Sequence, residues 1–299
     1  MNAHLQPQTH LHRVELKPKD YKNETTPSFW CAGCGHYGVL TGLLRSLSEI
    51  GVDPNYLVSV SGIGCSSRLP YFVNSYKMHT LHGRAGPVAT GIHLARPDLA
   101  VVVSGGDGDG FSIGGGHMPH LARKNINMTY ILMDNHVYGL TKGQCSPTSR
   151  KVMKTTTTPY GGMEEPLDPV LYMLTYGATY VAQAFAGNVK LASQLIKDGM
   201  EHKGFAFINL LSQCPSFNEI DTAQAFKEAC DQVDAGHDVS NLDAAMHAVN
   251  TAKQACRIPT GLLYKTERPT LDQRMAELVK NVGGHKDYDL RKIIDLARP

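Results

Sequence analysis

The sequence lacks the features that mark several large classes of protein. Its 299 residues carry 29 basic and 27 acidic side chains, a net charge of +2, so no overall positive charge indicates nucleic-acid binding. No apolar run approaches the ~20 residues of a membrane-spanning helix. With 42% hydrophobic and 19% charged residues, the composition is not that of a disordered protein. We therefore expect a globular protein with a full core and with neither nucleic acid nor membrane among its partners.

The N-terminal segment has no apolar region of the kind found in secretory signals. Residues 1–20 are mostly polar, which predicts a flexible arm and a cytoplasmic protein. The cysteines number seven. An odd number in such a chain favours metal binding or redox chemistry over a framework of disulfides.

Short apolar runs alternate with stretches of helical periodicity, and we find no internal repeat. This alternation predicts an α/β fold with a mainly parallel sheet and helices on both faces. Residues 21–256 would form this domain, and residues 257–299 a C-terminal tail that packs on the core or on a partner. The strands are expected at 56–60, 99–103, 128–133, 179–185 and 205–211, and the helices at 41–49, 86–95, 113–124 and 242–255.

Two predicted strands are followed by oxygen ligands and glycines. Gly106-Asp107-Gly108 follows one strand, and Asn135 follows the next. Open α/β sheets bind ligands at the carboxyl ends of their strands. The two side chains and the carbonyl of Val137 would suit Mg²⁺, while the glycines would let the backbone approach a diphosphate. The segment matches neither the dinucleotide fingerprint nor the P-loop. The alternative is a glycine-rich turn with an Asp that caps a helix.

Four cysteines also lie at predicted helix or strand ends. Cys31 and Cys34 form a C-x-x-C pair before a helix, and Cys65 and Cys214 follow strands. Such a set could bind zinc or a [4Fe–4S] cluster, and because both take four ligands the residue types leave this choice open. A thioredoxin-like pair is disfavoured because no strand precedes Cys31. We expect the remaining three cysteines to be structural.

Six segments, in this order, resemble the β subunit of the 2-oxoacid:ferredoxin oxidoreductases. They are WCAGCGH from Trp30, GIGCSSR from Gly62, HGRA from His82, GGDGDGFSIGGGH from Gly105, DNHVYGLTKGQCSPTS from Asp134 and SQCP from Ser212. The resemblance extends from Trp30 to about Arg268. It implies a thiamine-diphosphate-binding fold of the pyrophosphate type.

The resemblance also implies the cofactors and their ligands. One [4Fe–4S] cluster would be bound by Cys31, Cys34, Cys65 and Cys214. Mg²⁺ would be bound by Asp107, Asn135 and the carbonyl of Val137. Thiamine diphosphate would be lined by Ile63, Gly64, Cys65, Ser66, Gly106, Gly108, Asp109, Gly139 and Leu140.

The implied activity is the interconversion of 2-oxoglutarate and coenzyme A with succinyl-CoA and CO₂, an oxidoreductase reaction of class EC 1.2.7. Electrons would pass through the cluster to ferredoxin. His82 and Arg84 would contact the substrate, and Lys142 would pair with the distal carboxylate of 2-oxoglutarate. For each of these three residues, a structural or solvent-exposed role is the alternative. An α subunit would complete the active site, in an (αβ)₂ heterotetramer.

Three alternative functions remain open. A pyruvate-specific or broad-specificity relative would use the same cofactors, and it would tend to have a small residue where this chain has Lys142. A non-oxidative thiamine enzyme would need no cysteine cluster. A zinc-stapled interaction subunit without chemistry would leave Asp107 and Asn135 without a purpose.

Overall fold

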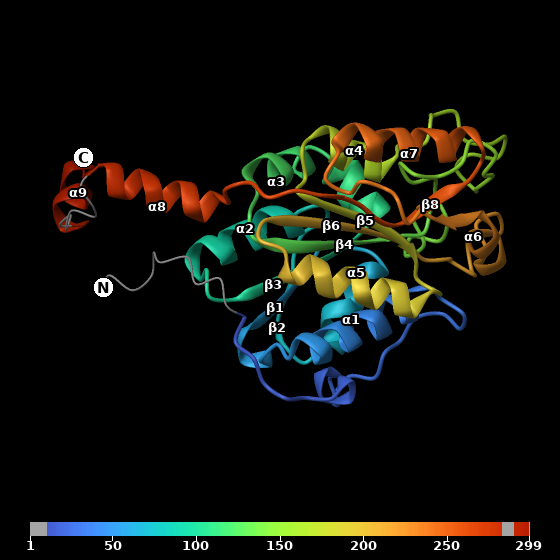
Figure 1. Ribbon diagram of the computed structural model, residues 1–299. Coiled ribbons are helices and arrows are strands. Elements are labelled where there is room, and N and C mark those ends of the chain that lie inside the picture. Colours follow the sequence, from blue (N-terminus) through green and yellow to red (C-terminus); the bar gives the residue numbers. More distant parts are fainter. Residues whose placement is uncertain (1–10, 283–289, 299) are drawn as a thin grey trace.

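The computed structural model describes residues 11–282 and 290–298, which fold around one eight-stranded sheet (Figure 1). The strands lie in the order β2-β1-β3-β4-β6-β5-β8-β7. All neighbours pair in parallel except β5 and β8, which are antiparallel. The strands are β1 Leu57–Ser61, β2 Tyr76–His79, β3 Ala100–Gly106, β4 Met128–Asp134, β5 Tyr180–Phe185, β6 Phe205–Leu211, β7 Cys230–Gln232 and β8 Ile258–Lys265. The predicted α/β class and parallel sheet are confirmed.

Helices cover both faces of the sheet, as predicted. On one face lie α1 (His36–Ile50) and α5 (Val189–Glu201), which pack against each other and against one apolar cluster. On the other face lie α2 (Ala85–Ala95), α3 (Met118–Lys124), α4 (Pro169–Thr175) and α7 (Leu242–Gln254). The central strands β4 and β6 are buried along their whole length, as expected for continuous apolar runs.

The remaining helices lie nearer the edges of the fold. They are α6 (Ala223–Ala229), α8 (Leu271–Asn281) and α9 (Leu290–Leu296). In Figure 1, α8 extends away from the sheet. The predicted helix at 113–124 is shorter than expected, because residues 109–113 form a π-helical turn and α3 begins only at Met118.

The structure shifts both predicted domain borders. Residues 258–265 form β8, which pairs with β5 inside the sheet, so the expected tail from residue 257 begins within the domain. At the other end, Leu11 and Leu16 pack on the core, and the amide of Val14 donates to the carbonyl of Gly51 at 2.6 Å. Residues 11–20 are therefore docked rather than a free arm, while residues 1–10 lie outside the described part of the chain.

Candidate active site

The four loops that carry the predicted site leave the sheet at the same edge. They follow β1, β3, β4 and β6, which are consecutive in the parallel part of the sheet. Parallel strands place their carboxyl ends together, so the loops after Ser61, Gly106, Asp134 and Leu211 become neighbours. Sequence segments that are far apart in the chain thereby form one site.

A cavity of about 540 Å³ lies between the first three of these loops. All nine residues predicted to line thiamine diphosphate line it, together with the three predicted Mg²⁺ ligands and His82. Arg84 and Lys142 do not line it, and both are exposed. Arg84 instead contacts the imidazole of His117. The structure thus brings together the expected cofactor residues and leaves two of the three expected catalytic residues outside the cavity.

Asp107 is held in a buried, polar setting. Its Oδ2 accepts hydrogen bonds from the hydroxyls of Ser146 at 2.5 Å and Thr148 at 2.8 Å. Burial, and next the charge of Asp134, raise the pKa of Asp107 to about 6. A cation bound here would relieve both effects, because it would favour the ionised carboxylate. This donor set therefore fits a hard cation, with Asn135 and the carbonyl of Val137 beside it in the same cavity.

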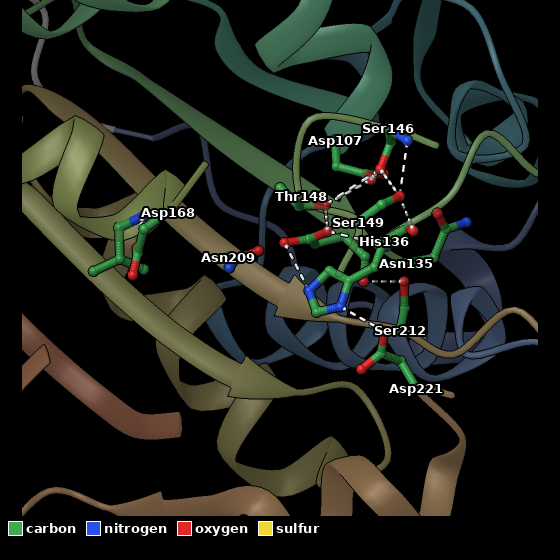
Figure 2. Close-up of polar contacts among 12 residues, drawn as sticks. Asp107, Asn135, His136, Ser146, Thr148, Ser149, Asp168, Asn209, Ser212 and Asp221 are labelled. Atoms are coloured by element: carbon green, nitrogen blue, oxygen red, sulfur yellow. Dashed lines mark hydrogen bonds and ion pairs between the residues drawn. The ribbon is translucent and has the colours of Figure 1, made fainter. Parts of the chain in front are cut away.

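A network of ionisable groups supports the Asp107 and Asn135 loops from behind (Figure 2). The imidazole of His136 lies between Asp134 and Asp221, with Nδ1 at 3.0 Å from Asp221 Oδ2. Burial alone would lower the pKa of His136. The carboxylates of Asp134 and Asp221 outweigh this effect and raise that pKa to about 9. Thr148 joins this network to Asp107, since its hydroxyl lies 2.9 Å from Asp134 Oδ1. Sequence reasoning gave these residues no role.

Asp109 lines the cavity and also binds three protein groups. Its Oδ1 accepts from the amides of Ile63 and Gly83, both at 2.8 Å, and lies 2.7 Å from His82 Nδ1. The carboxylate is nearly fully buried. It therefore holds the loop after β1 and the loop before α2 against each other, and it orients the His82 ring.

Close packing requires glycine at position 108, and Gly139 lies beside the cysteines. A Cβ on Gly108 would overlap the ring of Tyr138, whose hydroxyl donates to the Gly108 carbonyl at 3.2 Å. A Cβ on Gly139 would lie 3.4 Å from the sulfur of Cys214 and 3.8 Å from that of Cys65. Gly139 therefore marks the point where the cofactor cavity adjoins the cysteines.

The four predicted cysteine ligands belong to three loops that are tied together. The indole of Trp30 donates to the backbone carbonyl of Cys65 at 2.7 Å. The backbone amide of Gly35 donates to the backbone carbonyl of Gln213 at 3.0 Å. Burial raises the pKa of the thiols of Cys34, to about 12, and of Cys65 and Cys214. Each of these three thiols would also feel the charge of Cys31 if both were ionised.

This arrangement fits a group that neutralises several thiolates at once. Within residues 11–282 and 290–298, no three His, Cys, Asp or Glu side chains are placed to hold a single metal ion. A zinc ion binds thiolates at about 2.3 Å, which brings their sulfurs within about 4 Å of one another. A cluster with its own iron and sulfide atoms spans a wider set of thiols. Among the described residues the thiols are therefore not arranged as a site for one ion.

Comparisons with known proteins agree with this site. Residues 62–210 match the family model described as "Thiamine pyrophosphate enzyme, C-terminal TPP binding domain". Residues 214–280 match the model of the C-terminal part of the pyruvate ferredoxin oxidoreductase beta subunit. No helix among the described residues is long and apolar enough to span a membrane.

Two curated relatives and one solved structure show how far the similarity extends. The chain is 40% identical over 270 residues to subunit β of 2-oxoacid:ferredoxin oxidoreductase 2 from Aeropyrum pernix, covering 87% of each. It is 45% identical to the 2-oxoglutarate synthase subunit KorB of Methanothermobacter marburgensis, covering 67% of this chain and 70% of that protein. A structure of 2-oxoglutarate:ferredoxin oxidoreductase from Magnetococcus marinus, with 2-oxoglutarate, coenzyme A and succinyl-CoA bound, superposes with a TM-score of 0.90. It is 61% identical and covers 96% of this chain and 98% of that one.

Proposed function

The chain belongs to the β subunits of the 2-oxoacid:ferredoxin oxidoreductases, and from that premise we propose that it interconverts 2-oxoglutarate and coenzyme A with succinyl-CoA and CO₂. The observation that carries the proposal is the junction at Gly139, where the thiamine cavity adjoins the sulfurs of Cys65 and Cys214. An oxidative reaction needs an electron acceptor close to the cofactor, and these thiols provide the place for one. A non-oxidative thiamine enzyme would not need it.

We propose that the resident cofactors are thiamine diphosphate, Mg²⁺ and one [4Fe–4S] cluster. When bound, they would supply an electron sink for decarboxylation, charge neutralisation for the diphosphate and one-electron transfer. Asp107, Asn135 and the carbonyl of Val137 would hold the Mg²⁺. The nine cavity-lining residues would position the thiamine diphosphate, and the four cysteines the cluster. The raised pKa of Asp107 supports the Mg²⁺ site. The hydrogen bonds that join the loops of the four cysteines support the cluster site.

This chain's own residues would prepare the site in two ways. Ser146 and Thr148 fix Asp107 Oδ2, which leaves the other carboxylate oxygen for the cation. Asp109 orients His82, whose second ring nitrogen can then donate or accept a proton at the cavity. We propose that His82 contacts the substrate or its product in this way. Arg84 lies just outside the cavity, so we propose that it contacts a substrate that the partner chain also helps to hold.

Lys142 is the proposed specificity residue, and its backbone supports a functional role. Its φ of 74° lies in the left-handed region, which glycine adopts freely and a side chain does not. Gly143 follows with a φ of 93°, so the turn is built for glycines. A lysine in such a turn costs stability, which is explained if its ammonium pairs with the distal carboxylate of 2-oxoglutarate.

The partners of this chain are also part of the proposal. Leu81, Ile113 and Leu140 expose 75%, 54% and 43% of their surface near the cavity. Exposed apolar side chains around a cofactor cavity indicate that another chain covers it. We propose that the covering chain is an α subunit, which joins this β chain in an (αβ)₂ assembly. We also propose that the α8 region packs on a partner and that ferredoxin receives the electrons. The free thiols suit a cytoplasmic location.

The experiment is an anaerobic assay of the αβ complex for CoA-dependent reduction of a low-potential acceptor. We expect 2-oxoglutarate to be preferred to pyruvate. In Lys142→Gly the KM for 2-oxoglutarate should rise about tenfold or more, the loss of one charge-assisted pair, while the KM for pyruvate should not rise. Lys154→Ala, another exposed lysine in the following loop, is the control and should change neither value. Equal turnover of both acids by the unaltered complex would contradict the substrate assignment and leave the family unaffected.

A further inference from the structure

A second cavity, of about 700 Å³, opens at the carboxyl ends of β4, β5 and β6. It shares no lining residue with the cofactor cavity. His136 lines it, while the two residues on either side of His136 in the chain line the cofactor cavity. The second cavity is therefore a separate space on the far side of the His136 loop, at the edge where α/β sheets bind ligands.

Two buried amide side chains form the floor of this cavity. Gln183 on β5 and Asn209 on β6 stand opposite each other in the sheet, each the one amide in an otherwise apolar strand. Their exposed fractions are 6% and 2%. Buried polar groups lower stability unless they are hydrogen-bonded. An amide atom left without a partner at this depth would therefore cost stability.

The hydrogen bonds fix the orientation of both amides. The carbonyl of Pro259 can only accept, and it receives Gln183 Nε2 at 2.8 Å. Gln183 Oε1 must then face Asn209, whose Nδ2 donates to it at 2.8 Å. Asn209 Oδ1 is left buried and without a donor among the described residues. Asn209 lines the cavity, so the floor contains a buried hydrogen-bond acceptor that has no partner among the described residues.

Cationic side chains form part of the wall. Arg150, Lys253 and Arg257 line the cavity. The carboxylates that pair with the two arginines, Asp221 and Asp231, do not line it. Lys253 is exposed, and none of the ion pairs within the described part of the chain involves it.

One carboxylate, that of Asp168, does lie on the wall of the cavity. Its Oδ1 accepts from the amides of Val170 and Leu171, which begin α4. The wall thus carries Lys253, two ion-paired arginines and the imidazole of His136, against one carboxylate that already caps a helix.

We propose that this second cavity binds a small organic anion that carries a hydroxyl or amino group. The anionic group, a carboxylate or a phosphate, would contact Lys253 and the arginines. The hydroxyl or amino group would donate to Asn209 Oδ1. Both ends of the ligand are thereby specified, and a bare anion or a lone water molecule would satisfy only one of them.

The test compares ligand pairs that differ only in a hydroxyl, by calorimetric titration into the assembled αβ complex. The pairs are malate against succinate, and glycerol 3-phosphate against propyl phosphate, which separates the two sources of negative charge. At least one hydroxylated member should bind about fivefold more tightly than its twin, the worth of one hydrogen bond. Lys253→Ala should weaken that binding about fivefold. Lys190→Ala, an exposed lysine on α5, is the control and should leave it unchanged.

Two further variants test the hydroxyl contact and the independence of the two cavities. Asn209→Leu should abolish the preference for the hydroxyl while some affinity for the anion remains. Lys142→Gly should change neither ligand pair, because the 2-oxoacid site is elsewhere. The proposal is overturned if no compound binds at millimolar concentration, if the twins bind equally, or if Lys253→Ala and Lys190→Ala have the same effect. Since Lys253 is exposed, its variant folds and decides the matter even if Asn209→Leu does not.

Discussion

At the scale of single residues, the site depends on buried polar groups whose partners are other protein groups. Asp109 illustrates the point, because its carboxylate holds two loops together and orients His82. From the sequence alone it was expected simply to line the cofactor. The glycine–aspartate pattern predicted where the cofactor cavity lies. It could not predict which oxygen atoms the protein itself occupies, since that depends on loops distant in the chain.

Asp109→Asn should destabilise the protein strongly, although aspartate and asparagine are nearly the same size. The amide keeps one acceptor, but it loses the charge that strengthens three hydrogen bonds, and it places an NH₂ group where Oδ2 has no partner. We expect the free energy of unfolding to fall by about 2 kcal/mol. Denaturant unfolding measures this, with Asp98→Asn as the control, because the solvent-screened pair of Asp98 with Arg96 should contribute much less. Equal losses of stability in the two variants would show that Asp109 does not hold the two loops together.

Gly108→Ala tests the contact with Tyr138. The added methyl group would overlap the Tyr138 ring, and overpacking of this kind costs about 1–3 kcal/mol. Thermal unfolding should show this loss, and Tyr138→Leu should recover part of it in the double variant. The position was predicted to be glycine for the sake of a diphosphate. If Tyr138→Leu gives no recovery, the diphosphate is the better reason for a glycine here.

At the scale of elements, the sequence predicted the central strands well because each is a continuous apolar run. It did not predict β8, in which Pro259 and Gly261 interrupt the β pattern. Gly261 adopts a φ of 123°, and β8 runs antiparallel to β5, so neither its composition nor its direction follows the repeating βαβ rule. The predicted domain border at residue 257 fell in the wrong place for this reason.

Two truncations distinguish the predicted border from the observed one. A chain that ends at residue 257 loses β8, which exposes the edge of β5 and the buried Leu263, and it should not fold. A chain that ends after Thr270 keeps the whole sheet and should retain a cooperative unfolding transition. Circular dichroism and limited proteolysis of the two chains measure the difference. A folded chain ending at residue 257 would show that β8 is dispensable.

The turn between α5 and β6 carries a pH dependence. Burial, and next the charge of Lys265, lower the pKa of His202 from 6.5 to about 4, and its Nε2 lies 2.8 Å from Thr179 Oγ1. Because the unfolded chain binds this proton more readily, stability is full above pH 6.5 and falls as the pH drops toward 4. The total loss should be about 3 kcal/mol.

His202→Gln should remove this part of the pH dependence. Denaturant unfolding at a series of pH values between 7 and 4 would show a shallower slope for the variant. His247→Gln is the matched control, because His247 is exposed on α7. A variant with the same slope as the unaltered protein would place the pH dependence in other groups.

At the scale of the whole molecule, strand order rather than any single motif creates the site. The sequence predicted four cysteines and two cation ligands at strand or helix ends, and the sheet places those ends side by side. It could not predict the supporting network, since Asp134 ends β4 while Thr148 and Asp221 lie in separate loops, and their approach depends on the complete fold. The sequence did not predict the pairing of Gln183 with Asn209 in the second cavity for the same reason.

The most direct test of the central claim is the metal content of the chain purified anaerobically. We expect iron and acid-labile sulfide in equal amounts, about four of each per chain, with little zinc. Cys65→Ser should lose most of this iron, while Cys145→Ser, whose thiol contacts Thr158 and is not one of the four predicted ligands, should keep it. Stoichiometric zinc without sulfide, or iron that survives Cys65→Ser unchanged, would contradict a redox centre beside the thiamine cavity.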